Sequence, residues 1–261
     1  MTEPGYPTSI GRSQPDSISV LGNDLSDDLI GRVGFGELAF WLVALRRPSP
    51  GELRLFEAVL VALADHGLTP SAIAARLTLT GAPESMQGAL AAGLLGGGSR
   101  FLGVTEDCGK FLAAALADHD GPLPDDDGGW DVLARSAVQR RRDRGQLVPG
   151  LGHPVHKDGD PRTPAIIAVA TEAGVHGAHL ALFEAIGRVH AEVLGRTLPL
   201  NGAGVCGAAL ADLGFSATTL RGFALLARTA GLLGHLAEEQ RRPIGMAIYD
   251  HVERSTDYRR P

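Results

Sequence analysis

The most restrictive feature of this chain is its helical patterning. Alanine and leucine dominate the sequence, and few runs of β-branched residues are long enough to form strands. Residues 8–21 are the exception, because Ile10, Ile18 and Val20 alternate there with polar residues in a pattern typical of a short arm or hairpin. With 44% hydrophobic residues, the 261-residue chain can fill the core of one large domain, or at most two. The sequence therefore predicts an all-α fold with a short N-terminal extended arm or hairpin.

Within this pattern we place the arm at residues 1–22 and a helical domain of about ten helices at residues 23–261. An amphipathic helix is expected at residues 52–65, where one apolar stripe is formed by Leu53, Phe56, Leu60 and Leu63. A basic helix is expected at residues 130–146. Its QRRRDR run is interpreted as a solvated face, with a phosphate-binding patch as the alternative.

Capping residues mark where further helices begin. Thr69 and Pro70 form the cap and first turn of one helix, and Pro83 opens the next. The last third, residues 163–240, is predicted to hold three helical stretches, with breaks near Gly174, residues 195–201 and Gly214.

Composition and charge argue against several classes of protein. The longest apolar run, residues 38–45, is far shorter than the roughly 18 residues that a membrane span needs, and the N-terminus lacks a secretory pattern. We therefore expect a cytoplasmic protein that does not bind membranes. A net charge of −6 argues against non-specific nucleic-acid binding. The two cysteines, Cys108 and Cys206, are interpreted as buried thiols.

The segment PGLGHPVHKDGDPR, residues 149–162, concentrates groups suited to an anion site. Gly150 and Gly152 can take positive φ and let the backbone approach a ligand closely. Pro161 fixes a turn that presents Arg162 at the start of the next helix, and a guanidinium there suits a carboxylate or a phosphate. The alternative is a solvated turn with an incidental histidine, His153.

A long helix at residues 218–240 repeats basic residues on one face, because Arg221, Arg228 and His235 are seven residues apart. Arg228 lies among small apolar residues, so it either points into a pocket or belongs to a solvated polar face.

Other familiar motifs are excluded by their context. Gly202, Gly204 and Gly207 fit a dinucleotide-binding pattern, but no strand precedes them. His153 with His156, and likewise His176 with His179, lack the HExxH spacing, so no metal site is predicted.

Five motifs follow one another along the chain: DHG at residues 65–67, GLGHPVHKDGDPR at 150–162, LPLNGAG at 198–204, ARTAGLLGHLAEE at 227–239 and RRP at 241–243. In this order they resemble the citrate synthase superfamily, with most similarity to citryl-CoA lyases and the lyase domain of ATP-citrate lyase. The segment GLLGGGSRFLG at residues 93–103 is similar to the lyase form of a motif that carries a histidine in citrate synthases. Phe101 stands at that histidine's position.

This resemblance implies a homodimeric, all-helical carbon–carbon lyase. It would split citryl-CoA into acetyl-CoA and oxaloacetate, or run the reverse condensation. By matching motifs, His66 and His153 are the expected catalytic residues that hold the oxaloacetate part. Carboxylate and other substrate contacts are expected from Arg162, Arg228, Asn201 and, across the dimer interface, Arg242.

The same resemblance implies coenzyme A, bound as a thioester, along the loop at residues 148–152. The residues expected to contact it are Val148, Gly150, Leu151 and Gly152.

The chain departs from its relatives at Ala203, where they carry an aspartate that moves a proton on the acetyl carbon. Asp212 is too far along its helix to replace that group. Another group or a bound water would then take over the proton transfer. The alternatives are a catalytically silent homologue that binds dicarboxylate and coenzyme A, and a lyase for another 3-hydroxyacyl-CoA.

Overall fold

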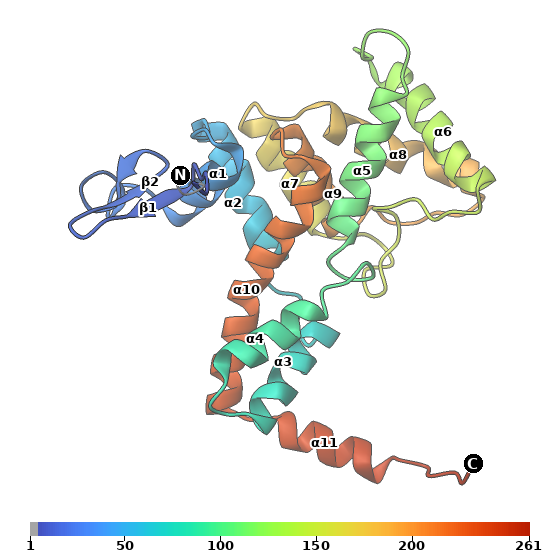
Figure 1. Cartoon of the computed structure of the whole chain (residues 1–261). Helices are drawn as coiled ribbons and strands as arrows, with labels where there is room; N and C mark the ends of the chain where they lie inside the picture. The colour runs from blue at the N-terminus through green and yellow to red at the C-terminus, as the bar shows by residue number, and fades with distance from the viewer. Residues whose placement is uncertain (1–4) are drawn as a thin grey trace.

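The computed structural model describes residues 5–261, and these residues form a helical fold with one small sheet at the N-terminus (Figure 1). Three short antiparallel strands, β1 (Gly11–Ser13), β2 (Ile18–Val20) and β3 (Asn23–Asp24), pair in the order β1-β2-β3. Gly11 lies opposite Val20. The all-α prediction with an N-terminal hairpin is therefore confirmed, and the sheet continues two residues beyond residue 22 because β3 pairs with β2.

The rest of the described chain is almost entirely helical. One π-helical turn comes first, followed by eleven α-helices: η1 (Leu25–Leu29), α1 (Phe35–Ala44), α2 (Pro50–Ala64), α3 (Pro70–Gly81), α4 (Met86–Leu95), α5 (Val104–Ala117), α6 (Asp127–Asp143), α7 (Arg162–Glu172), α8 (Ala178–Leu194), α9 (Gly202–Asp212), α10 (Ala217–Arg241) and α11 (Gly245–Arg254). The last third thus holds four helices, α7 to α10, where three were predicted. Each of the three predicted breaks separates two of them.

Side-chain caps explain where several helices begin. The Thr69 side chain accepts a hydrogen bond from the backbone N–H of Ala72, which confirms the predicted cap of α3. Helix α4 begins at Met86, later than Pro83, because Ser85 ends the intervening turn and caps the helix. Asp126 caps α6 in the same way, so this basic helix starts before the predicted residue 130.

Two clusters of buried side chains hold the fold together, and α10 belongs to both of them. The larger cluster includes the first half of α10 up to Ala227, together with α2, α5, α8 and α9. The smaller cluster packs the second half of α10, through Leu232 and Leu236, against α3 and α4. Arg228 therefore lies on the one helix that joins the two clusters, at the point where they meet.

The predicted stripe on α2 is rotated in the structure. Phe56 and Leu63 are buried as expected, whereas Leu53 and Leu60 are only half-buried. Leu55 and Val59 are fully buried in their place, because α2 is covered by neighbours on a wider face than one stripe.

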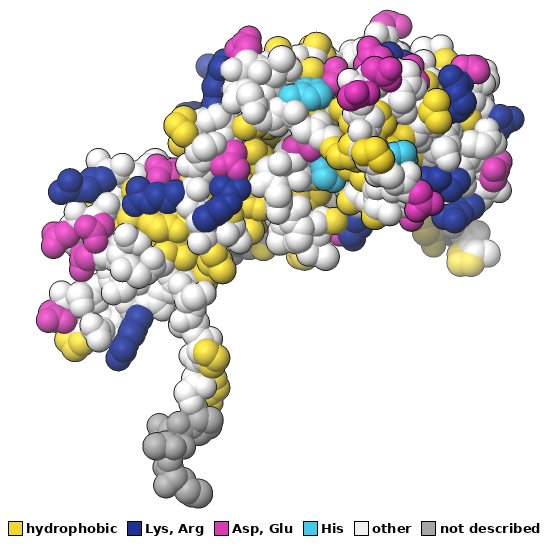
Figure 2. Space-filling model, turned by 90° about the horizontal axis from the view of Figure 1, so that it is seen from above, with side chains coloured by type: hydrophobic (Ala, Val, Ile, Leu, Met, Phe, Trp, Pro, Cys, Tyr) yellow, Lys and Arg dark blue, Asp and Glu magenta, His cyan; other side chains and the backbone are white. Residues whose placement is uncertain are grey.

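The surface carries charges of both signs, and Figure 2 shows acidic and basic side chains interspersed over one face. No helix among residues 5–261 combines the length and the apolar character needed to cross a bilayer.

Candidate active site

A cavity of about 380 Å³ lies beside Arg228, between the two packed clusters. Loops and helix ends far apart in the sequence form its wall: the end of α2, the start of α3, the α4–α5 loop, the α6–α7 loop, the start of α9 and the middle of α10. Among the lining residues are the predicted site residues His66, His153, Arg162, Asn201 and Arg228. Five of the six residues expected at the substrate thus share one cavity.

Arg228 is buried in this wall without a hydrogen-bonding partner for its charge. Its side chain is 6% exposed, and neither Nε nor Nη1 is hydrogen-bonded. The nearest carboxylate oxygen, Oδ1 of Asp65, lies 4.0 Å from Nη1. Burial lowers the pKa of Arg228, and Asp65 opposes this shift. A buried guanidinium with unused donors is costly, so this geometry favours an anionic ligand.

Arg162 also faces the cavity, but Asp160 already neutralises its charge. Oδ1 of Asp160 accepts from Nε at 3.0 Å, and Oδ2 accepts from Nη2 at 2.7 Å. Burial would raise the pKa of Asp160, but the hydrogen bonds from Arg162 and from the Gly202 backbone N–H hold it well below its usual range. The Nη1 group donates to the carbonyl of Ala62 at 3.3 Å. The guanidinium of Arg162 is therefore oriented before any ligand binds, because each of its three nitrogens donates to a protein oxygen.

The ring of His153 is anchored by its own loop. Nδ1 accepts hydrogen bonds from the backbone N–H groups of Val155, at 3.1 Å, and His156, at 3.0 Å. Because Nδ1 accepts twice, the proton of the neutral ring lies on Nε2. Burial lowers the pKa of His153, and the neighbouring His156 and His66 lower it further, whereas Asp160 raises it. His153 is thus set up as a neutral hydrogen-bond donor toward a ligand oxygen.

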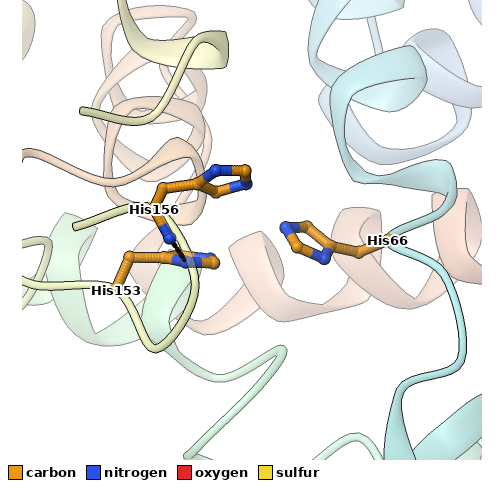
Figure 3. Close-up of side chains that lie close together, drawn as sticks. All are labelled: His66, His153 and His156. Carbon is orange, nitrogen blue, oxygen red and sulfur yellow. Dashed lines mark hydrogen bonds between the residues drawn. The ribbon is translucent and has the colours of Figure 1, made fainter. Parts of the chain in front are cut away.

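Three imidazoles meet here, as Figure 3 shows: His66 at the end of α2 faces His153 and His156 from the α6–α7 loop. The ring centroids are 5.2 Å apart for His66 and His153, and 4.5 Å apart for His153 and His156. One nitrogen from each ring lies within 4.8 Å of the others, which is a spacing that a metal ion could use. A metal needs a free lone pair on each ligand, however, and in neutral His153 the Nδ1 lone pair accepts two backbone N–H groups while Nε2 carries the ring proton. The observed arrangement therefore favours hydrogen bonding over metal binding.

The start of α9 forms the floor between His153 and Arg162. Both ends of the Asn201 amide are used within the protein, since Oδ1 accepts from the Gly204 N–H and Nδ2 donates to the Gly152 carbonyl. Ala203 lines the cavity, at the position where a carboxylate was missing from the sequence pattern. Asp212 is not available as its substitute, because it caps α8 through the N–H groups of Gly177 and Leu180.

A second cavity, of about 560 Å³, adjoins the first and shares Val104, Gly152 and Asn201 with it. All four residues expected along coenzyme A line this cavity: Val148, Gly150, Leu151 and Gly152. The two glycines have φ of 87° and 84°, as predicted.

Three backbone groups of these glycines are already hydrogen-bonded within the protein. Gly152 donates to Pro199, and the carbonyls of Gly150 and Gly152 accept from Asn201. The loop at residues 148–152 is held against the start of α9, so it offers a close wall and few free donors.

The basic end of α6 reaches the same cavity. Arg140, Arg141 and Arg144 line it, together with Lys110 from α5. Nε of Arg141 is bound to the carbonyl of Leu147 at 2.9 Å. The run that was interpreted as a solvated face therefore forms part of a cavity wall, which favours the alternative of a phosphate patch.

Arg242 does not join the other site residues. It is exposed and follows the last residue of α10, fourteen residues after Arg228. A helical rise of ~1.5 Å per residue separates the two by about 21 Å, which is beyond the reach of an arginine side chain.

Sequence reasoning missed one residue of this wall, Arg100, and two residues that contact it, Asp160 and His156. Asp160 stands two residues before Arg162, and that spacing was the available signal for an ion pair. His156 was considered only as half of a metal pair. Arg100 lines the cavity from the α4–α5 loop, and nothing in its local sequence indicates this position.

Comparisons with known proteins identify the family and the fold of this chain. The family described as "Citrate synthase, C-terminal domain" matches residues 29–248. The citryl-CoA lyase of Hydrogenobacter thermophilus has a similar structure, with a TM-score of 0.85 and 28% identity over 98% of this chain and 95% of that one.

Two further similarities are more distant. The ATP citrate lyase of Methanothrix soehngenii, solved with citrate and coenzyme A, has a TM-score of 0.79 and 23% identity over 100% of this chain and 43% of that one, which shows the fold alone. A probable ATP-citrate synthase of Dictyostelium discoideum is 24% identical, over 93% of this chain and 39% of that protein. The chain thus spans well under half of the curated relatives that it matches.

Proposed function

Because the chain belongs to the citrate synthase family, we propose that it is a carbon–carbon lyase that splits citryl-CoA into acetyl-CoA and oxaloacetate, or catalyses the reverse condensation. The observation that carries this proposal is Arg228, whose buried guanidinium has unused donors facing a cavity beside two histidines. The similarity to a citryl-CoA lyase over nearly the whole of both chains supports the choice of reaction.

The dicarboxylate part of the substrate is assigned to the cavity beside Arg228. One carboxylate would bind Nε and Nη1 of Arg228, and another would approach the N–H groups of Arg162 that are not bonded to Asp160 or Ala62. His66 and His153 would hold the oxaloacetate oxygens. In this arrangement His153 donates a hydrogen bond from Nε2 to the substrate oxygen and keeps its proton, while that oxygen becomes a carbonyl as the carbon–carbon bond breaks. Asn201 would shape the floor, since its own amide is already bonded.

Coenzyme A is assigned to the adjoining cavity. Its thioester end would lie along Val148, Gly150, Leu151 and Gly152, near the shared boundary of the two cavities. Its phosphates carry negative charge, and the side chains that suit them lie at the other wall: Lys110, Arg140 and Arg144.

Arg242 is proposed to complete the site of a second copy of the chain. Since it lies about 21 Å along α10 from Arg228, it cannot serve the same cavity. Figure 1 shows α11 and the C-terminus leading away from the rest of the chain, in a position that could extend toward a partner. This placement supports a homodimer in which each α10 end supplies Arg242 to the other subunit.

A second candidate function is favoured by Ala203, which cannot transfer a proton. A homologue that binds dicarboxylate and coenzyme A without turnover would keep the arginines and lack the acid. Cleavage of another 3-hydroxyacyl-CoA, with a different substrate side chain, is a variant of the first proposal.

Incubation with citryl-CoA, malyl-CoA and methylcitryl-CoA, with products identified by mass spectrometry, tests these readings together. Release of oxaloacetate and acetyl-CoA from citryl-CoA supports the lyase. Binding of oxaloacetate and coenzyme A by calorimetry without release, with activity gained in Ala203→Asp, supports the silent homologue. If the protein neither binds these ligands nor cleaves citryl-CoA, both proposals are contradicted.

A further inference from the structure

The residues described so far do not include the base that the proposed cleavage needs. Cleavage of a 3-hydroxyacyl thioester needs a base to remove the hydroxyl proton and an acid to protonate the enolate carbon. His153 cannot take the hydroxyl proton at Nε2 in its neutral form, because its Nδ1 accepts two backbone hydrogen bonds and Nε2 already carries the proton. A different group must act as the base.

Among the described residues, no carboxylate lines this cavity. Asp160 is held by Arg162 and by the N–H of Gly202. Asp65 is bound to the ring of His235 at 2.9 Å, and Asp107 lines only the neighbouring cavity. Apart from arginines, the titratable side chains that line the cavity are the imidazoles of His66 and His153.

His156 is not among the residues that line the cavity, but its ring packs beside both of these imidazoles. It is half-buried, and its ring packs edge-on against His66, with centroids 5.4 Å apart, and lies 4.5 Å from His153. One nitrogen of each ring lies within 4.8 Å of the other two. Two hydrogen bonds of about 2.9 Å through one water span about 4.7 Å, so a single water can connect any two of these nitrogens.

Resting on the proposed lyase function, we propose that His156 is a positioning residue that shares with His66 the proton moved in the reaction, in place of a carboxylate. The O–H proton of the substrate passes to His66, and the O–H electron pair forms the new carbonyl. The electrons of the broken carbon–carbon bond go to the thioester enolate. Its carbon then takes a proton from the imidazolium that His66 and His156 share, so no proton is gained or lost overall.

Charged groups around the cluster set the pH range of this exchange. Asp160 and Arg162 face His153 as an ion pair, and Arg228 lies across the cavity. Lys157 and Asp158 follow His156 on its own exposed loop. A proton on one imidazole disfavours a second, because like charges repel at these distances.

The test compares His156→Gln with His119→Gln, a matched change at another half-buried histidine, which lies outside both cavities. We expect His156→Gln to lower kcat for citryl-CoA about 10- to 100-fold, less than the loss of a direct acid or base, with KM nearly unchanged. The pH profile of kcat should also change, and added imidazole should restore rate to His156→Ala. His119→Gln should match the wild type.

NMR titration of the His153 ring in the unliganded protein gives a readout that does not depend on turnover. In His156→Gln its pKa should rise, because one neighbour that lowers it is gone. A wild type that fails to cleave any thioester would defeat the lyase proposal, whereas this titration would still report on the cluster. An unchanged rate, pH profile and titration in a folded His156→Gln would overturn the inference. So would one tightly bound metal ion per chain that His156→Gln loses.

Discussion

The carboxylate of Asp160 accepts hydrogen bonds from two nitrogens of Arg162, with Oδ1 3.0 Å from Nε and Oδ2 2.7 Å from Nη2. Because of this ion pair, the two arginines Arg162 and Arg228 have different roles in the cavity. The charge of Arg162 is largely neutralised by Asp160, whereas Arg228 has unused N–H donors for an anionic ligand. The pair therefore sets the shape of the site, and Arg228 supplies its attraction for an anion.

Replacing Asp160 with Asn is expected to destabilise the protein by about 3 kcal/mol or more at pH 7, because Arg162 loses its buried partner. The pKa of Asp160 is depressed in the folded protein. Its stabilising contribution is therefore fully present above about pH 4 and is lost as the pH falls through the folded value. Urea unfolding at pH 7 and pH 3 should show a smaller difference between variant and wild type at the lower pH. Asp158→Asn, on the same loop but exposed, should change stability by less than about 0.5 kcal/mol.

Arg228→Met is expected to bind oxaloacetate about 10- to 100-fold more weakly, since a charged hydrogen bond contributes about 1.5–3 kcal/mol. The unliganded variant should be at least as stable as the wild type, because a buried unpaired charge is replaced by an apolar side chain of similar length. Calorimetry and thermal unfolding measure the two effects. Arg221→Met, one heptad earlier on α10 and paired with Glu106 at 2.6 Å, should leave affinity unchanged. Unaltered affinity in Arg228→Met would remove it from the substrate site.

Gly202→Ala should disturb the Asp160–Arg162 pair from the other side. A Cβ atom at residue 202 would lie 2.3 Å from Nε of Arg162, so the guanidinium must move. We expect a loss of about 1–3 kcal/mol in unfolding free energy and weaker oxaloacetate binding. Gly234→Ala is the matched control on α10, where a Cβ meets nothing within 4 Å. It should gain about 0.5–1 kcal/mol, as alanine usually does over glycine inside a helix. Equal effects of the two changes would contradict the steric argument.

Arg242→Ala and Arg228→Met should complement each other if Arg242 acts in the partner subunit. Each variant alone should be nearly inactive, because every site lacks one arginine. After mixing under conditions that exchange subunits, mixed dimers contain one site with both arginines, so activity should recover to about a quarter of the wild type. A chain that stays monomeric in sedimentation analysis, or a mixture that stays inactive, would place Arg242 outside the active site.

Much of the local structure could be predicted from the residues. The cap at Thr69, the breaks near Gly174 and Gly214, and the positive φ of Gly150 depend on neighbours in sequence, and all of them are present. Predictions that depended on distant partners were less complete. The stripe on α2 is rotated because the helices packed on it, not its own periodicity, decide which residues are covered.

The candidate site shows the same division. The motifs identified His66, His153 and Arg228, and the structure brings these residues to one cavity. The basic run at residues 139–144 could be interpreted as solvated or as a phosphate patch, because its pattern is the same in both cases. Only the packing of α6 beside α5 and the loop at residues 148–152 makes it part of a wall.

By itself the sequence determined the helical class of this protein, most of its helix boundaries and the residue types of an anion site, because propensity, caps and glycine conformations act over a few residues. Tertiary structure decided which of these groups meet at one cavity and which of them keep unused hydrogen-bond donors there. It buried Arg228 without a hydrogen-bonding partner, placed Arg162 against the carbonyl of Ala62, and brought His66 to the rings of His153 and His156. Those outcomes depend on contacts between segments up to about a hundred residues apart, as between Arg162 and the carbonyl of Ala62, and on the exclusion of water around them.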